Sequence, residues 1–309
     1  MIPTFAQSRS TTEPAPPLLR VDSTYVWIPA LVRDKAGEAA NCADVKGIKL
    51  FDNGNPENVT EIETHGLPIS LVILMQTGAT AGGFLGAYIN LPALINSMVG
   101  NAVHEITLVT FDSRVQEIWH FPTRTDGVAY ALTHQHPGNK GAAIKDAIAF
   151  GVRQLQGEPG RFRRIILLLS QRNDVGSSTS SQSLLELLGT SSTIVYSLTI
   201  RGESTDAVRE RKKRRTTSID RGLDKANQAL DEQTADESSA LTGGTSYQFE
   251  DKEEFDSAMI QMLADFHSGI TLGFQPSRHA SGFHRIELKI DPPKLRVIAR
   301  RAYWSPGTE

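Results

Sequence analysis

The chain of 309 residues contains one cysteine, Cys42, so no disulfide bond can form within it. No apolar run approaches the length of about 20 residues that crosses a bilayer as a helix. The longest apolar runs, at 71–75 and 165–169, have the length of buried strands. We therefore expect a protein with no membrane span.

Neither sign of charge is in large excess. The formal net charge of −3 gives no general attraction to nucleic acid or to anionic membranes. The basic cluster RERKKRR at 209–215 has no interleaved aromatic residues, and acidic residues follow it closely. We interpret it as part of a solvated insertion and expect no nucleic acid among the partners.

Sequence motifs of the common enzyme classes are missing as well. The chain has no Gly-x-Ser-x-Gly elbow, no Walker loop, no dinucleotide glycine fingerprint and no cysteine nucleophile arrangement. The glycine-rich stretch at 78–83 lacks the Lys-Ser/Thr ending of a phosphate loop. These absences predict a protein that is not an enzyme and uses no cofactor.

What the sequence does contain is an ordinary globular composition, with 39% hydrophobic and 22% charged residues. Apolar strands are expected at 70–76, 105–111, 164–170 and 192–200. Helical spacing separates several of them, as at 141–156. Alternation of this kind indicates βαβ crossovers, which predicts an α/β fold with a doubly wound, mostly parallel sheet.

The two ends of the chain have a different, β-rich character. Strand-like segments occur at 24–32, 48–52 and 58–64, and again at 270–276, 283–290 and 295–304. Neither set alone buries a face well, so we expect them to pair. We predict a flexible tail at 1–20 and a small β-sandwich-like domain formed by 21–66 together with 269–306. An α/β domain at 67–268 is inserted into it, and this domain contains a mobile basic insertion at 201–218.

Several motifs carry a family resemblance. GIKLFDNGNPENV lies at 47–59, SALTGGTSY at 239–247, and ITLGFQPS, FHRIELKI and RVIARRAYW form the tail. Together they resemble the bacterial proteins related to von Willebrand factor A domains, of the type described from acidobacteria. The resemblance runs from about Val21 to Trp304. It implies an A-type α/β domain, a class whose usual role is partner binding.

Domains of this type usually hold Mg²⁺ through Asp-x-Ser-x-Ser, a later Thr and a distal Asp. The resemblance places Gln76, Gly78, Thr80, Ala142 and Gln171 at these positions. Only Thr80 keeps a hydroxyl, and both carboxylates are replaced by neutral amides. Because Mg²⁺ prefers hard, charged oxygen ligands, we predict a degenerate adhesion site without metal.

Two interpretations of this rim stay open. The two glutamine side chains either hydrogen-bond each other and stabilise the loops, or the rim is a partner surface that binds without metal. Our leading hypothesis is a non-enzymatic, adhesion-type module that binds a protein partner outside the cytoplasm, in a secreted, periplasmic or cell-surface setting. No intact signal peptide is visible in the first residues, MIPTFAQSRS.

Two alternatives come from other classes. A structural component would assemble through edge strands of the β-rich domain, and exposed edges near Phe274, Phe283 or Tyr303 would favour it. A zinc enzyme would use the His134/His136 loop, with Asp112 or Asp174 nearby. No third ligand stands at a recognisable spacing, which disfavours the zinc site. The sequence leaves the partner and the oligomeric state open.

Overall fold

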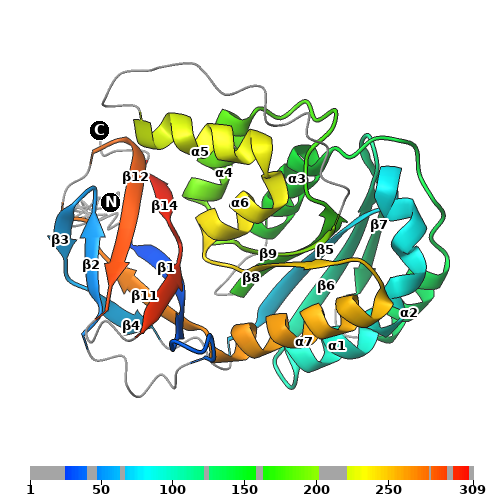
Figure 1. Cartoon of the computed structure of the whole chain (residues 1–309), viewed down its shortest axis with the longest axis horizontal. Coiled ribbons are helices and arrows are strands. Elements are labelled where there is room, and N and C mark those ends of the chain that lie inside the picture. Colours follow the sequence, from blue (N-terminus) through cyan, green and yellow to red (C-terminus); the bar gives the residue numbers. More distant parts are fainter. Residues whose placement is uncertain are drawn as a thin grey trace, which may run out of the picture.

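The computed structural model describes residues 25–39, 47–62, 67–121, 125–157, 163–201, 221–277, 280–290 and 295–305. A layered α/β unit lies beside a smaller unit built only of strands (Figure 1). The predicted tail at 1–20 and all but Arg201 of the insertion at 201–218 lie outside the described residues.

The α/β unit is built on a six-stranded sheet. Its strands, in spatial order, are β10 (Ser246–Phe249), β9 (Ile194–Ile200), β8 (Arg163–Gln171), β5 (Ile69–Gln76), β6 (His104–Phe111) and β7 (Val115–Phe121). All neighbours are parallel except β7, which turns back antiparallel on β6 after a short turn. Every residue of the central strand β5 is buried, because helices cover both faces of the sheet.

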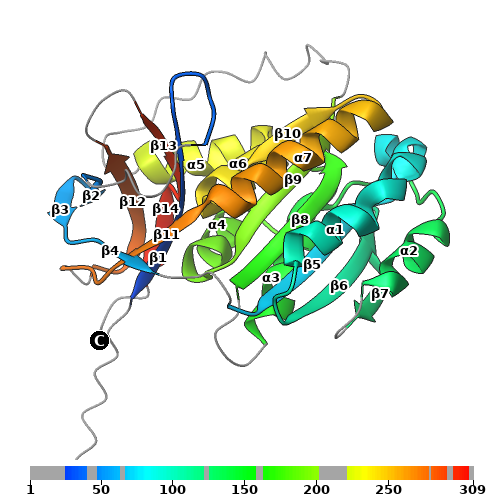
Figure 2. The ribbon, with the colours of Figure 1, turned by 90° about the horizontal axis from the view of Figure 1, so that it is seen from below.

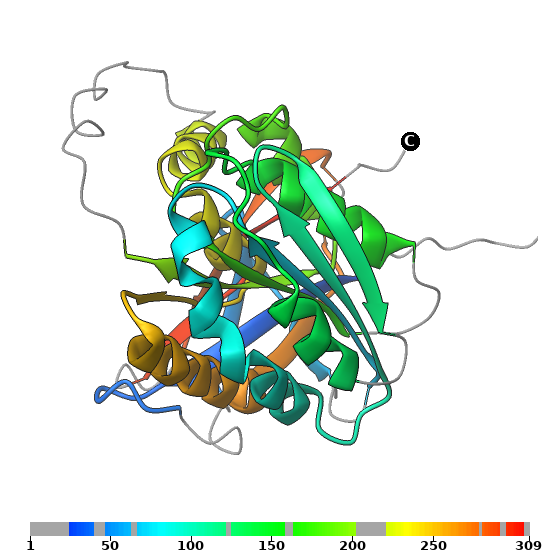
Figure 3. The same ribbon diagram turned by 90° about the vertical axis from the view of Figure 1, so that its right-hand side faces the viewer.

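Two helical layers enclose this sheet (Figure 3). One face is covered by the 3₁₀ segment η2 (Ala79–Asn90) and by helices α1 (Leu91–Val99), α2 (Asp126–Thr133) and α7 (Lys252–Ser268). The other face is covered by α3 (Ile144–Gln156), α4 (Ser181–Thr190), α5 (Arg221–Glu232) and α6 (Thr234–Thr242). Helices α1 and α7 lie side by side (Figure 2).

Side-chain caps define where two of these helices begin. The Asp251 carboxylate accepts a hydrogen bond from the Glu254 backbone N–H at 2.8 Å at the start of α7. Ser180 accepts from the Ser183 N–H at 3.1 Å at the start of α4. Such caps satisfy backbone donors that the helix itself leaves free.

The smaller unit consists of two four-stranded sheets. One has the order β13 (Arg296–Ala299), β1 (Val26–Arg33), β11 (Ile270–Phe274) and β4 (Thr60–Ile62). The other has the order β14 (Ala302–Ser305), β12 (Gly282–Lys289), β2 (Lys49–Asp52) and β3 (Asn55–Glu57). Strands from the two ends of the chain alternate in the first sheet, and β12 pairs with β2 in the second, so both sheets combine the two ends. The predicted fold class is confirmed. The exact limits of the two domains stay predictions.

The motifs that carry the family resemblance meet in the core of the β unit. The Asp52 carboxylate accepts hydrogen bonds from the Tyr303 hydroxyl at 2.7 Å and from His284 Nδ1 at 2.9 Å. His284 Nε2 contacts the Ala280 carbonyl oxygen at 2.8 Å. All three side chains are buried, so these motif residues join strands β2, β12 and β14.

One arginine joins the two units. Arg300, between β13 and β14, is 5% exposed and donates to the carbonyl oxygens of Leu188 and Gly189 in α4, at 3.2 and 2.6 Å. It also donates to the carbonyls of Ala302 and Trp27, at 2.8 and 3.3 Å. Burial lowers the pKa of this guanidinium to about 10, so it remains charged near neutral pH. Its charge lies at the carboxyl end of a helix, where a cation is favoured.

Candidate functional site

The loops at the carboxyl ends of β5 and β8 bring the two predicted glutamines together. The Gln76 amide nitrogen donates to the Gly78 carbonyl at 2.9 Å and to Gln171 Oε1 at 3.3 Å. The Gln76 side-chain oxygen Oε1 accepts from the Gln171 backbone N–H at 2.8 Å, and Gln171 Nε2 donates to the Asn173 carbonyl at 2.8 Å. Gln76 is fully buried. The amides therefore tie two neighbouring strand ends to each other.

Gly78 occupies a position at which no side chain fits. A Cβ atom placed there would lie 2.5 Å from the Asn139 carbonyl oxygen, 2.6 Å from the Gly141 carbonyl oxygen and 2.7 Å from the Asp112 Cβ. The Ala79 backbone N–H, on a residue with a positive φ of 48°, donates to the same Asn139 carbonyl at 2.8 Å. The loop around Asn139 thus leaves no space for a side chain at Gly78, the position that the family resemblance aligns with a ligating serine.

The remaining two predicted rim residues differ in burial. Ala142 is fully buried and forms a β-bridge with Val175, with N–H to carbonyl distances of 3.2 and 2.8 Å. Thr80 is exposed, and no hydrogen bond among the described residues links its hydroxyl to the glutamine pair. This set of neutral groups does not fit a divalent cation, which needs several hard oxygen ligands around one point.

Asp112 is the buried carboxylate of this rim, yet neutral donors surround it. One oxygen accepts from the Gln116 amide at 2.6 Å and from the Arg114 backbone N–H at 3.3 Å, and the other accepts from the Asn139 N–H at 3.1 Å. Burial by itself raises the pKa of Asp112, but these hydrogen bonds outweigh it and hold the pKa below its ordinary value. The carboxylate therefore anchors the Asn139 loop.

The pH dependence of stability should reveal this anchor. Asp112→Asn is expected to lower the free energy of unfolding at pH 7 by about 1–2 kcal/mol, because the amide nitrogen faces other donors. The folded-state pKa lies below the unfolded one, so the contribution of Asp112 is present above about pH 4 and is lost as the pH falls. Urea denaturation at pH 7 and pH 3 should show a smaller difference for the variant than for the unmodified protein. Asp224→Asn, at an exposed position of α5, is the control, and equal pH dependence of both variants contradicts the assignment.

The His134/His136 loop, considered as a zinc site and disfavoured, has hydrogen bonds and ring contacts within the protein. The His134 ring stacks on Tyr130 with ring centroids 3.8 Å apart, and its Nδ1 contacts the Tyr130 carbonyl at 2.7 Å. His136 is exposed. The Asp174 carboxylate accepts from the Lys145 backbone N–H at 2.9 Å, at the start of α3. Within the described residues, no group of three His, Cys, Asp or Glu side chains is placed to hold a metal ion.

The structure also shows a rim residue that sequence reasoning missed. Val175 is 53% exposed although its backbone is fixed by the bridge to Ala142. The following residue, Gly176, has a φ of 93°, which only glycine adopts easily. The sequence does contain a signal for it, because Val175 is the one branched apolar residue in the otherwise polar loop QRNDVGSS. The exposed rim thus presents an apolar side chain on a fixed backbone.

Comparisons with known proteins give only distant similarities. No protein-family model and no curated protein matches the chain. Among solved structures it is similar to proximal thread matrix protein 1 of the mussel byssus, with 10% identity and a TM-score of 0.43 over 79% of this chain and 51% of that one. An aerotolerance-related membrane protein from Bacteroides fragilis NCTC 9343 gives 16% identity and a TM-score of 0.39 over 64% of this chain and 98% of that one.

A pilus adhesin from Lactobacillus rhamnosus GG gives 10% identity and a TM-score of 0.44 over 78% of this chain and 34% of that one. The chain therefore spans about half the length of the mussel protein and a third of the adhesin. The fold class of the α/β unit follows from its own sheet, which is parallel except for the antiparallel edge strand β7.

Proposed function

We propose that this chain is a non-enzymatic binding module of the adhesion type, which recognises a protein partner at the rim of the six-stranded sheet without a metal ion. The observation that carries the proposal is the mutual hydrogen bonding of Gln76 and Gln171 beside the closely packed Gly78. By the family resemblance, these neutral amides and backbone carbonyls would stand where A-type domains bind a cation. Recognition then depends on shape and on neutral contacts.

Val175 is the side chain best placed to make such a contact. Single exposed apolar residues are common on protein surfaces, so its exposure alone carries little weight. Its position matters more, because it lies beside Ala142 on a loop that the Asp174 carboxylate anchors to α3. A fixed apolar side chain loses little conformational freedom on binding, which favours affinity.

Partner capture from a native extract tests this proposal. The immobilised protein should recover the same partner with and without a chelator, and Val175→Asp should reduce the recovery about tenfold or more, equivalent to at least about 1.4 kcal/mol. Val103→Asp is the matched control, because Val103 is 71% exposed and precedes β6 at the opposite, amino-terminal edge of the sheet. Loss of the partner on chelation, or equal losses for the two variants, would contradict the proposal.

The proposed location is outside the cytoplasm, where an adhesion-type module would meet its partner. Among the described helices, none combines the length and the apolar character required to cross a membrane. Fractionation of cells that produce the natural gene product, with detection by antibody, would test the location directly. Recovery in the cytoplasmic fraction alone would contradict it.

A second candidate function is self-assembly through the edges of the β unit. Strands β3, β4, β13 and β14 stand at sheet edges among the described strands, which favours this idea. Of the edges expected near Phe274, Phe283 or Tyr303, β14 carries Tyr303 at the edge of its sheet. The side chains of Phe274 and Tyr303 are only 1% and 3% exposed, and Phe283 is half-buried, so they offer little apolar surface to a second copy. Light scattering at several concentrations separates the two functions, because stable oligomers favour assembly and a monomer favours partner capture.

A further inference from the structure

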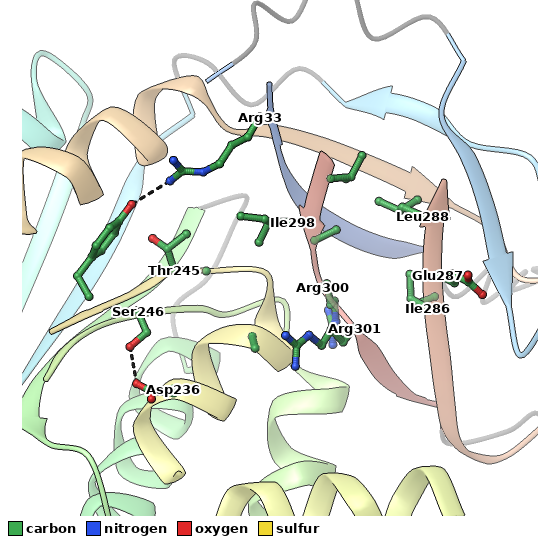
Figure 4. A pocket seen from close by; sticks show the side chains of 15 residues that line it. Arg33, Asp236, Thr245, Ser246, Ile286, Glu287, Leu288, Ile298, Arg300 and Arg301 are labelled. Carbon is green, nitrogen blue, oxygen red and sulfur yellow. Dashed lines mark hydrogen bonds between the residues drawn. The ribbon is translucent and has the colours of Figure 1, made fainter. Parts of the chain in front are cut away.

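A groove lies between the α/β unit and the β unit, on a different part of the molecule from the rim. Its volume is about 500 Å³, which is in the range of ligand sites. One side is formed by α6 and β10, and the other by β12 and β13 (Figure 4). No motif in the sequence pointed to it.

The groove exists because two strands separate. Strands β13 and β14 are consecutive, and the chain passes from one sheet to the other at Arg300 and Arg301. Strand β14 pairs with the first half of β12, and the last hydrogen bond on this side runs from the Ile286 N–H to the Arg301 carbonyl at 2.8 Å. Beyond it, β12 continues with β2 while β13 continues with β1. Among the described strands, the facing edges of β12 and β13 therefore have no partner.

These edges present backbone hydrogen-bonding groups to the groove. In an antiparallel strand, the N–H and C=O groups of successive residues alternate between the two edges. The Arg300 N–H donates to Pro29 of β1, so Val297 and Ala299 direct their N–H and C=O groups to the other edge. The same alternation from Ile286 places the groups of Leu288 on the facing edge of β12. All three residues line the groove.

The side chains around the groove are apolar in the middle and cationic towards its ends. Ile298 is 37% exposed and lies between Arg33 and Arg301 in Figure 4. The Arg301 side chain is 63% exposed, although it contacts Glu237 at 3.3 Å. Arg33 is held in place by hydrogen bonds to Tyr247 and Asp265.

The acidic side chains of the lining have cationic partners elsewhere. Asp236 pairs with Arg172, and Glu287 pairs with Lys289 at 3.4 Å. Arg301 also pairs with Glu237 through Nη1, but it is the most exposed cation of the lining and can take a second carboxylate. A ligand with carboxylates and small apolar side chains matches this surface.

We propose that this groove binds an extended peptide segment of another polypeptide, which adds to the free edge of β13 as a further strand and carries a carboxylate that pairs with Arg301. Main-chain hydrogen bonds would supply affinity, and alternate side chains would contact Ile298 and Leu288. At a rise of about 3.3 Å per residue, the four residues of β13 pair with about four peptide residues. A second copy of this chain fits less well, because its edge strand belongs to a folded sheet and would have to enter the groove between α6 and β10 on one side and β12 and β13 on the other.

A defined peptide probe tests the proposal on the full chain. The probe is a fluorescein-labelled heptapeptide of alternating valine and glutamate, with two companions. One companion has lysine in place of glutamate, and the other has N-methylated peptide bonds that cannot donate. Fluorescence polarisation should show that the glutamate peptide binds about tenfold more tightly than the lysine peptide, equivalent to about 1.4 kcal/mol. The N-methylated peptide should not bind.

Two variants locate the binding. Ala299→Pro removes an N–H that points into the groove and leaves the β1 ladder intact, since proline is tolerated on a free edge. It should weaken peptide binding at least tenfold, and Arg301→Gln should abolish the preference for glutamate. Thermal melting shows whether Ala299→Pro is folded. Hydrogen exchange of the unmodified protein gives a readout that needs no variant, because the amides of Val297 and Leu288 should exchange more slowly when the peptide is bound.

The proposal is overturned if no peptide binds at about 1 mM, a weak limit equivalent to about −4 kcal/mol. It is also overturned if the N-methylated peptide binds equally well or if exchange at Val297 and Leu288 does not change. Val175→Asp should leave peptide binding intact. Failure at the rim and failure at the groove are therefore distinguishable.

Discussion

Replacing Arg300 by alanine is expected to lower the free energy of unfolding by about 3–5 kcal/mol, the largest effect of any single side chain considered. The guanidinium donates to four backbone carbonyls, two of them in α4 of the other unit. Removing it leaves buried acceptors without donors and a cavity between the units. The gain from no longer burying an unpaired charge offsets only part of this loss.

Urea denaturation followed by intrinsic fluorescence measures this loss of stability, because Arg300→Ala should unfold at a lower midpoint concentration of urea than the unmodified protein. Arg301→Ala changes the adjacent, exposed arginine and should stay within about 0.5 kcal/mol, as surface substitutions do. Arg300→Lys should fall between the two, since an ammonium group keeps the charge but cannot reach four carbonyls in a plane. A loss for Arg301→Ala as large as that for Arg300→Ala would refute this role.

Gly78→Ser is expected to destabilise the fold by about 3 kcal/mol, as overpacking of a tight site does. The substitution restores a residue of the Asp-x-Ser-x-Ser pattern, yet its Cβ would stand within 2.6 Å of two backbone carbonyl oxygens. Backbone cannot move aside as a flexible side chain can. Restoring the other ligands as well, through Gln76→Asp, Ala142→Thr and Gln171→Asp, should therefore not create a magnesium site.

Thermal melting with and without Mg²⁺ distinguishes the possible results. Specific binding to the folded state must raise the melting temperature by mass action, and we expect no rise. Gly83→Ser is the matched control, because nothing lies within 4 Å of a Cβ at that nearby glycine. The prediction is wrong if the Gly78→Ser protein is as stable as this control or if its melting temperature rises with Mg²⁺. Either result would mean that the loop around Asn139 moves enough to admit the serine side chain.

The fold could be predicted largely from the sequence because its signals are local. Fully apolar strands such as 165–169 and helical stripes such as that of α3 indicate a sheet with both faces covered. The pairing of the two chain ends followed from the inability of either set of strands to bury a face alone. Between β5 and α1 the chain forms a 3₁₀ segment from Ala79 to Asn90. Pro92 at the start of α1 suits the first turn of a helix.

The site could be predicted only in part. The interaction of Gln76 with Gln171 follows from two strand ends that must be neighbours in a parallel sheet. Val175 and Arg300 could not be found in this way, because exposure and carbonyl coordination depend on contacts between distant segments. The groove depends on the separation of β12 from β13, and no local pattern in the amino-acid sequence predicts that separation.

The order of strands in the β unit also bears on how the chain is made. Strand β1 pairs on its two edges with β11 and β13, and both of these strands are synthesised after the whole six-stranded sheet. During synthesis the inserted sheet can therefore form first, and until β11 and β13 are made neither edge of β1 has a hydrogen-bonding partner strand. A nascent chain stalled before β11 would present β1 as an apolar strand with no partner on either edge, and unpaired strand edges of this kind promote association between chains.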